Sequence, residues 1–154
     1  SENKIIVFGK DEEVLPYKLA NCCNPIPGDR IFGFTTVEDG IKIHKDDCPN
    51  SIQLRSNYAY RILESSWVDK EKIDFIATIN VKGIDRLGLI NNVTKIISSQ
   101  MNVNMRAINI NSDDGLFEGE ITLFVHNVTV LNILTEKLKN VDGITKIKRT
   151  YKHI

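Results

Sequence analysis

The sequence has few cysteines, prolines and tryptophans and no excess of either charge. It contains three cysteines, four prolines and one tryptophan, and 20 Lys and Arg residues offset 20 Asp and Glu residues. An odd number of cysteines fits a disulfide framework poorly, and balanced charge gives no bulk attraction to nucleic acid or a membrane. No apolar run approaches the roughly 20 residues that cross a bilayer, and no hydrophobic signal segment follows Ser1. These absences predict a soluble, cytoplasmic protein without a membrane partner.

The scarce residue types are concentrated in one half of the chain. Every cysteine, every proline and the single tryptophan lie in residues 1–70, and none occurs in residues 73–154. The short polar segment 67–72 has no apolar periodicity and separates these halves. A chain of 154 residues can hold one ordinary domain or two very small ones. We therefore expect two domains, residues 1–70 and residues 71–154.

The second half of the chain alternates between strand and helix periodicity. Odd positions of residues 73–81 are apolar, which indicates a half-buried strand, and residues 89–97 show helical spacing. The alternation slips across residues 103–110, which indicates a bulge. Asp114-Gly115 is a hairpin signal, and a second helical pattern covers residues 131–141. The predicted order is βαββαβ, a ferredoxin-like α+β fold with two helices on one face of an antiparallel sheet.

The first half is predicted to be a small mixed α+β module. Its patterns suggest strands at 4–8 and 60–67, a helical turn at 15–21, a hairpin at 31–36 and 41–44, and a helix from Pro49 to about Asn57. A module of about 70 residues has a marginal core, so a bound metal would be physically useful.

Four residues in this module form a candidate metal site. Cys22 and Cys23 precede a stiff proline- and glycine-containing turn, and His44 and Cys48 follow the predicted hairpin. Together they are a possible Cys₃His set for tetrahedral Zn²⁺. Adjacent cysteines in extended chain point to opposite faces, so both can bind only if the chain turns between them. Asp47 or a water is an alternative ligand, and half-buried free thiols or a Cys–His nucleophile are alternative interpretations.

Two segments carry a resemblance to a known family. Residues 19–34, with Cys22-Cys23, and residues 40–50, with His44 and Cys48, resemble the conserved-cysteine module of the Rel/SpoT family. That family comprises the (p)ppGpp synthetase/hydrolases of the bacterial stringent response, and the module is called the zinc-finger or ribosome-intersubunit domain. An ACT domain follows it in the family. Residues 85–89 resemble the Asp-Arg-Pro-Gly-Leu motif of ACT domains, with Leu87 in place of proline.

The resemblance implies a regulatory function. The chain would be a non-catalytic C-terminal fragment of a GTP pyrophosphokinase and/or (p)ppGpp 3'-pyrophosphohydrolase, whose catalytic domains lie elsewhere. Its expected partners are the large-subunit RNA of the ribosome and the catalytic domains of the same protein. The family also raises the expectation of Zn²⁺ at Cys22, Cys23, His44 and Cys48.

A second function is also open, because free-standing ACT domains pair side by side and bind amino acids. The residues that would form such a ligand site are Asp85, Arg86, Gly88, Leu89 and Asn104. This alternative is an amino-acid-sensing module that forms a homodimer. The competing interpretation is that Gly88 only permits a tight turn and Asn104 makes a local bond.

Basic residues near the first hairpin are candidates for RNA contact. Arg30, Lys42 and Lys45 flank its strands and can neutralise phosphates. A solvated protein face is the alternative interpretation, and the zero net charge predicts only weak binding by this region alone.

Overall fold

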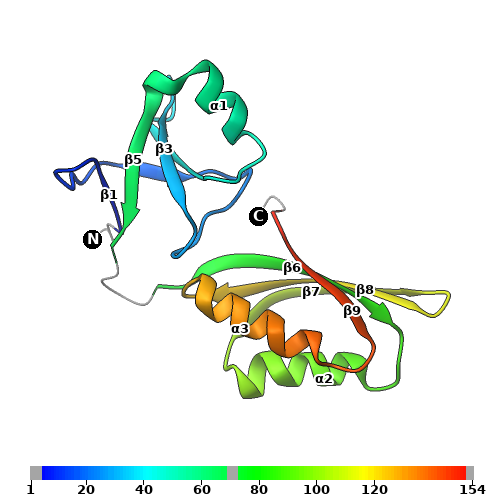
Figure 1. Cartoon of the computed structure of the whole chain (residues 1–154). Coiled ribbons are helices and arrows are strands. Elements are labelled where there is room, and N and C mark those ends of the chain that lie inside the picture. Colours follow the sequence, from blue (N-terminus) through cyan, green and yellow to red (C-terminus); the bar gives the residue numbers. More distant parts are fainter. Residues whose placement is uncertain (1–4, 69–72, 152–154) are drawn as a thin grey trace. The chain divides into compact units, whose positions relative to one another are not determined.

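The computed structural model describes residues 5–68 and 73–151. These residues form two compact units. The described residues up to 68 belong to the first, called here the N-terminal unit, and residues 73–150 form the C-terminal unit. Each unit has its own sheet (Figure 1). None of the helices among the described residues is long and apolar enough to cross a membrane.

The N-terminal unit is a five-stranded sheet with one short helical connection. The strand order is β1-β5-β3-β4-β2. The strands are β1 (Ile6–Phe8), β2 (Tyr17–Leu19), β3 (Ile31–Thr35), β4 (Ile41–Lys45) and β5 (Ile62–Trp67). Helix α1 (Ser51–Asn57) and the 3-10 turn η1 (Ala59–Arg61) connect β4 to β5 (Figure 1). The predicted hairpin, the helix after Pro49 and the last strand are therefore present.

The predicted helical turn at residues 15–21 is wrong. Residues Tyr17–Leu19 are a strand instead, and they pair in parallel with Ile41–Ile43 of β4. Parallel partners are joined by a long crossover and not by a tight turn, so no local turn signal marks such a strand. The hairpin loop also differs from a two-residue Asp-Gly turn, because residues 36–40 connect β3 to β4. Thr36 Oγ1 bridges this loop by donating to Gly40 O at 2.6 Å.

The C-terminal unit has the predicted βαββαβ order. Its elements are β6 (Phe75–Ile84), α2 (Leu89–Lys95) with the π-helical turn η2 (Ile96–Gln100), β7 (Asn104–Asp113), β8 (Leu116–Val125), α3 (Val128–Lys139) and β9 (Ile144–Thr150). The sheet order is β7-β8-β6-β9, and every neighbouring pair is antiparallel. Helices α2 and α3 cover the same face of this sheet (Figure 1).

The core of the C-terminal unit lies between the sheet and these two helices. Its most buried side chains come from alternating strand positions and from one face of each helix: Ile79, Val81, Ile121, Leu123, Leu89, Ile97, Leu131, Leu134 and Leu138. The predicted bulge is present between Met105 and Ala107 of β7. Asp114 and Gly115 both have positive φ, 54° and 78°, as a tight hairpin turn requires.

Candidate metal centre

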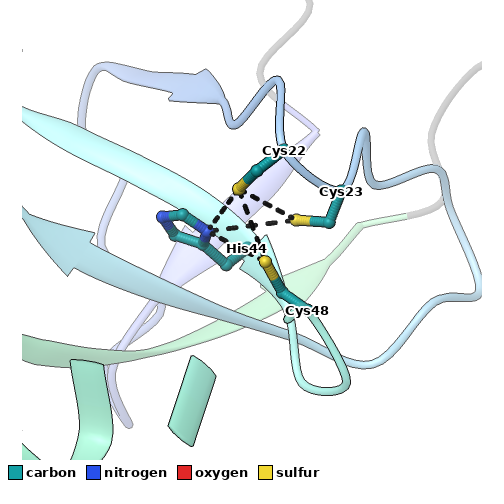
Figure 2. A group of neighbouring side chains, drawn as sticks. All are labelled: Cys22, Cys23, His44 and Cys48. Carbon is teal, nitrogen blue, oxygen red and sulfur yellow. Dashed lines mark hydrogen bonds between the residues drawn. The ribbon is translucent and has the colours of Figure 1, made fainter. Parts of the chain in front are cut away.

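The chain brings the four candidate ligands together from three segments. Cys22 and Cys23 lie in the turn after β2, His44 is in β4, and Cys48 lies in the loop before α1. Asn24 N–H donates to Ala20 O at 2.9 Å, and Asn24 has a φ of +42°. The chain thus turns around the two adjacent cysteines, and Figure 2 shows both sulfurs pointing into one cluster. The geometric requirement for adjacent cysteine ligands is therefore met.

The distances between the candidate ligand atoms are compatible with a metal site. Cys22 Sγ lies 3.4 Å from Cys48 Sγ and 4.0 Å from Cys23 Sγ. His44 Nδ1 lies 3.4, 3.9 and 3.8 Å from the sulfurs of Cys22, Cys23 and Cys48. Zinc bonds of about 2.3 Å to sulfur and 2.0–2.1 Å to nitrogen imply tetrahedral edges of about 3.8 Å and 3.5 Å. All four atoms lie within 4.8 Å of one another, so the donor set fits a tetrahedral Zn²⁺ ion.

The cluster is shielded from water and its sulfurs receive backbone hydrogen bonds. Cys23, Cys48 and His44 are buried, and Cys22 is half-buried. Lys45 N–H donates to Cys23 Sγ at 3.2 Å. Burial raises the pKa of the Cys23 and Cys48 thiols, although backbone hydrogen bonds from Lys45 and Asn50 act in the opposite direction. Burial, and secondarily the charge of Lys42, lowers the pKa of His44, which favours the neutral form of the imidazole.

The surroundings of Cys48 do not suit a cysteine nucleophile. A reactive cysteine needs a depressed thiol pKa, a neighbouring cation and partial exposure. Cys48 is 2% exposed and its thiol pKa is raised by burial. All three cysteines are free thiols and make no disulfide. The convergent sulfurs and imidazole are placed so that they could share one metal ion.

Sequence reasoning did not find the residues that surround His44. Phe32 is 3% exposed, and its ring stacks on the imidazole of His44 with centroids 5.5 Å apart. Arg55 lies over the Phe32 ring at 4.3 Å. The predicted hairpin could have indicated Phe32, because its register places Phe32 directly opposite His44. Arg55 carried no such signal, since it comes from a helix outside the sheet.

The predicted amino-acid site is only partly assembled. Asp85 N–H donates to Gly115 O at 2.9 Å, and Arg86 forms an ion pair of 3.2 Å with Asp142. Leu89 is 2% exposed and is therefore a core residue. Gly88 has a φ of +82° and begins α2, which is consistent with the conformational role of a turn glycine.

Asn104 does not lie with this loop. It pairs with Phe124, which in turn pairs with Ile76 at the start of β6. Residues 85–88 follow the other end of β6, about 25 Å away at 3.2–3.4 Å per strand residue. Within one chain, the structure does not join Asn104 to the rest of the predicted ligand set.

The three basic residues predicted for RNA contact do not form one positive patch. Lys42 and Lys45 are three positions apart in β4 and so point to opposite faces. Lys42 pairs with Asp39 at 3.5 Å, and Lys45 pairs with Asp47 at 3.4 Å. Arg30 and Lys45 line a hollow of about 380 Å³, which three aspartates also line. Carboxylates accompany each of these cations.

Comparison with known families matches both units. A family model described as RelA/SpoT RIS domain matches residues 5–68, and one described as ACT domain matches residues 71–149. The chain belongs to the RelA/SpoT family, and it carries the RIS and ACT domains of the C-terminal regulatory region. The resemblance noted in the sequence is thus confirmed.

Curated relatives of the chain carry the names of enzymes of this family. The chain is 32% identical over 139 residues to GTP pyrophosphokinase of Escherichia coli strain K12, covering 89% of this chain and 18% of that protein. It is 33% identical over 144 residues to GTP pyrophosphokinase of Streptomyces coelicolor, covering 93% of this chain and 17% of that protein. It is 32% identical over 133 residues to the bifunctional (p)ppGpp synthase/hydrolase RelA of Mycobacterium tuberculosis, covering 86% and 18%. The chain thus spans less than a fifth of the length of these relatives.

A solved structure also matches the second half. It is the ACT domain from GTP pyrophosphokinase of Chlorobium tepidum, 36% identical, with a TM-score of 0.47. The match covers 51% of this chain and 100% of that structure.

Proposed function

We propose that this region is the non-catalytic regulatory part of a stringent-response GTP pyrophosphokinase and/or (p)ppGpp hydrolase. The N-terminal unit would contact large-subunit RNA of the ribosome, and the C-terminal unit would couple that contact to the catalytic domains of the same protein. The observation that supports this proposal is the convergence of three sulfurs and one imidazole nitrogen in the unit that matches the RIS family. A metal cross-link at this point would give such a small domain a rigid shape.

In this proposal, Cys22, Cys23, His44 and Cys48 hold Zn²⁺. With four protein ligands the ion supplies a structural cross-link, because no open coordination position remains for substrate. His44 presents Nδ1 to the sulfurs, and the Lys45 backbone N–H supports the Cys23 sulfur. The cross-link joins the turn after β2 to β4 and to the loop before α1.

Metal content is the first test. Elemental analysis of protein purified without chelator is expected to give about one zinc per chain, and Cys48→Ser is expected to lose it. Asp47→Asn is the matched control, because Asp47 neighbours Cys48 and its carboxylate pairs with Lys45. If Cys48→Ser retained zinc and Asp47→Asn lost it, the Asp47 carboxylate and not the Cys48 thiolate would be the ligand. Metal absent from freshly folded, reduced protein would contradict the assignment of zinc.

Ribosome contact is tested separately by co-sedimentation with ribosomes at several salt concentrations. Weak binding that falls as salt rises is expected, because the net charge of the chain is zero and phosphate contacts release counterions. Arg30→Glu is expected to weaken it, whereas Lys137→Glu, on helix α3 of the other unit, serves as the control. A zinc-loaded chain that never co-sediments at low salt would contradict the ribosome proposal.

The chain is expected to form no (p)ppGpp from ATP and GTP.

A second candidate function is an amino-acid-sensing dimerisation module. Strand β7 lies at the edge of the C-terminal sheet, and its Ile108 is 39% exposed although the opposite residue, Ile121, is 1% exposed. Pairing of two copies along β7 would cover this apolar side chain. This function predicts a dimer that strengthens with an amino acid and is indifferent to ribosomes. Sedimentation velocity and calorimetry with each of the twenty amino acids test it, and a monomer that gives no heat would exclude it.

A further inference from the structure

The imidazole of His44 is held by a stacked aromatic ring. Strands β3 and β4 place Phe32 directly opposite His44, where side chains share one face of the sheet. The two rings are nearly parallel, with an interplanar angle of 18° and centroids 5.5 Å apart. Both residues are buried, at 3% and 7% exposure, so neither ring has much room to rotate. The stack fixes the plane in which Nδ1 faces the sulfurs.

The stack is a further means of orienting a histidine ligand. A metal-bound histidine commonly donates its second ring N–H to a carboxylate, carbonyl or water. Within residues 5–68 and 73–151, every hydrogen bond found for the His44 ring involves Nδ1 and a cysteine sulfur. The stack on Phe32 is therefore a protein contact that can set the orientation of the ring.

Arg55 links Phe32 to the loop that carries Cys48. Its guanidinium lies 4.3 Å from the centre of the Phe32 ring, in a cation–π contact. The same group donates from Nη2 to Asp46 Oδ1 at 3.0 Å. Asp46 stands two residues after His44 and two before Cys48, and Arg55 lies in the last turn of α1. The Arg55 side chain thus contacts Phe32, which stacks on His44, and also Asp46, which lies between His44 and Cys48.

We propose that Phe32 and Arg55 are positioning residues of the metal centre. Phe32 fixes the imidazole plane of His44, and Arg55 holds both the Phe32 ring and the 46–48 loop. Neither residue donates an atom to the metal, so their loss weakens binding through the geometry of the ligands. This inference rests on the proposed zinc site and deepens it.

The test measures metal affinity and metal geometry in the full chain. Zn²⁺ affinity is measured by competition with a chromophoric chelator, and the visible absorption of the Co²⁺-substituted protein reports tetrahedral geometry. Phe32→Leu keeps an apolar side chain but removes the ring, and it is expected to weaken Zn²⁺ binding by about 10- to 100-fold. Arg55→Met keeps the apolar stem and is expected to weaken it by about tenfold. Both are expected to alter the Co²⁺ spectrum at saturating metal.

A matched control is available in the next turn of the chain. Arg61 lies over Tyr58 and Tyr60 at 5.4 and 5.6 Å, and makes no contact with the cluster among the described residues. Arg61→Met is expected to leave the affinity within twofold and the Co²⁺ spectrum unchanged. A role in folding alone would lower stability without changing the spectrum of the saturated protein.

The outcomes separate this inference from the zinc site itself. An unmodified chain that binds no zinc would overturn both. Stoichiometric zinc in the unmodified chain, with Arg55→Met and Phe32→Leu both unchanged in affinity and spectrum, would overturn only the positioning role. Because Arg55 is exposed, Arg55→Met is expected to fold, and its affinity and spectrum test the positioning role even if Phe32→Leu does not fold.

Discussion

In the C-terminal unit the deepest side chains are aliphatic and come from long, regular elements. Ile79, Leu123, Leu134 and Leu138 are each 0–1% exposed, and strands β6 and β8 have ten residues each. In the N-terminal unit two strands have only three residues, and the buried set includes Cys23, Cys48 and the polar His44. One unit has a continuous apolar layer, whereas the other combines a smaller core with a cluster of candidate metal-ligand atoms.

This difference has a physical origin in size and periodicity. Regular strands and helices can align apolar positions over a whole face, so the C-terminal unit is stabilised by burial of those faces. A unit of about 70 residues with short strands has less surface to bury, and small domains commonly depend on metals or disulfides. The two units are therefore expected to respond to different perturbations.

Metal removal should give the largest difference in stability between the N-terminal and the C-terminal unit. A strong chelator is expected to abolish the folded state of the N-terminal unit, because structural zinc contributes about 10–16 kcal/mol of apparent binding free energy in zinc-finger peptides. The fluorescence of Trp67, the single tryptophan, reports this unit, and calorimetry reports both. The transition of the C-terminal unit should not move, and added Zn²⁺ should restore the first transition. Parallel shifts of both transitions would show that the units are not independent.

Truncation of a buried side chain in the C-terminal unit should destabilise that unit and leave the N-terminal unit unchanged. Leu134→Ala, at a fully buried position of α3, is expected to destabilise the C-terminal unit by about 2–5 kcal/mol. Zinc content and the Trp67 transition should stay as they are. The control Ile133→Ala, at a neighbouring position that is 47% exposed, should cost less than about 1 kcal/mol. Zinc lost from Leu134→Ala would contradict the separation of the two units.

A smaller effect is expected at the β6–β9 irregularity. The register shifts between Lys82 and Gly83, and a Cβ added at Gly83 would lie 2.2 Å from the carbonyl oxygen of Gly143. Gly83→Ala is therefore expected to cost about 1–3 kcal/mol through backbone displacement, measured by denaturant unfolding. Gly119→Ala is the comparison, because its nearest contact would be a movable Phe117 ring atom at 3.3 Å. Equal losses in the two variants would argue against the backbone clash.

The smallest expected effect is the pH dependence of the N-terminal unit. Burial raises the pKa of Tyr17, partly opposed by a backbone hydrogen bond with Ile5. Since the folded pKa exceeds that of the unfolded chain, this contribution to stability is present below pH 10 and is lost as pH rises through the folded value. Residues 73–150 contain no tyrosine, so tyrosinate absorbance reports the other unit and Tyr151.

Titration of zinc-loaded protein is expected to show a late tyrosinate step from Tyr17, and Tyr17→Phe should remove it. Tyr60, which is 78% exposed, supplies the control variant Tyr60→Phe. Persistence of the late step in Tyr17→Phe would assign it to another tyrosine.

The fold of the second half was predictable because its signals are local. Alternation in β6, the Asp114-Gly115 turn and the helical spacing around Leu134 each lie within a few residues. The strand at Tyr17–Leu19 was missed because its partner is 24 residues away and parallel, as in the Tyr17–Ile41 pair. Asn104 was grouped with residues 85–89, although strand register places it at the other end of β6 within one chain, and the sequence does not show that register.

The sequence alone determined the residue types of the candidate site, the hairpin that carries His44 and the βαββαβ order of elements in the second unit. It did so because side-chain chemistry, periodicity and turn residues act over short distances. Tertiary structure decided that the chain turns between Cys22 and Cys23, that four donor atoms converge, and that Phe32 and Arg55 support His44. These features depend on contacts between distant segments, which form only when the sheet and helix α1 pack together.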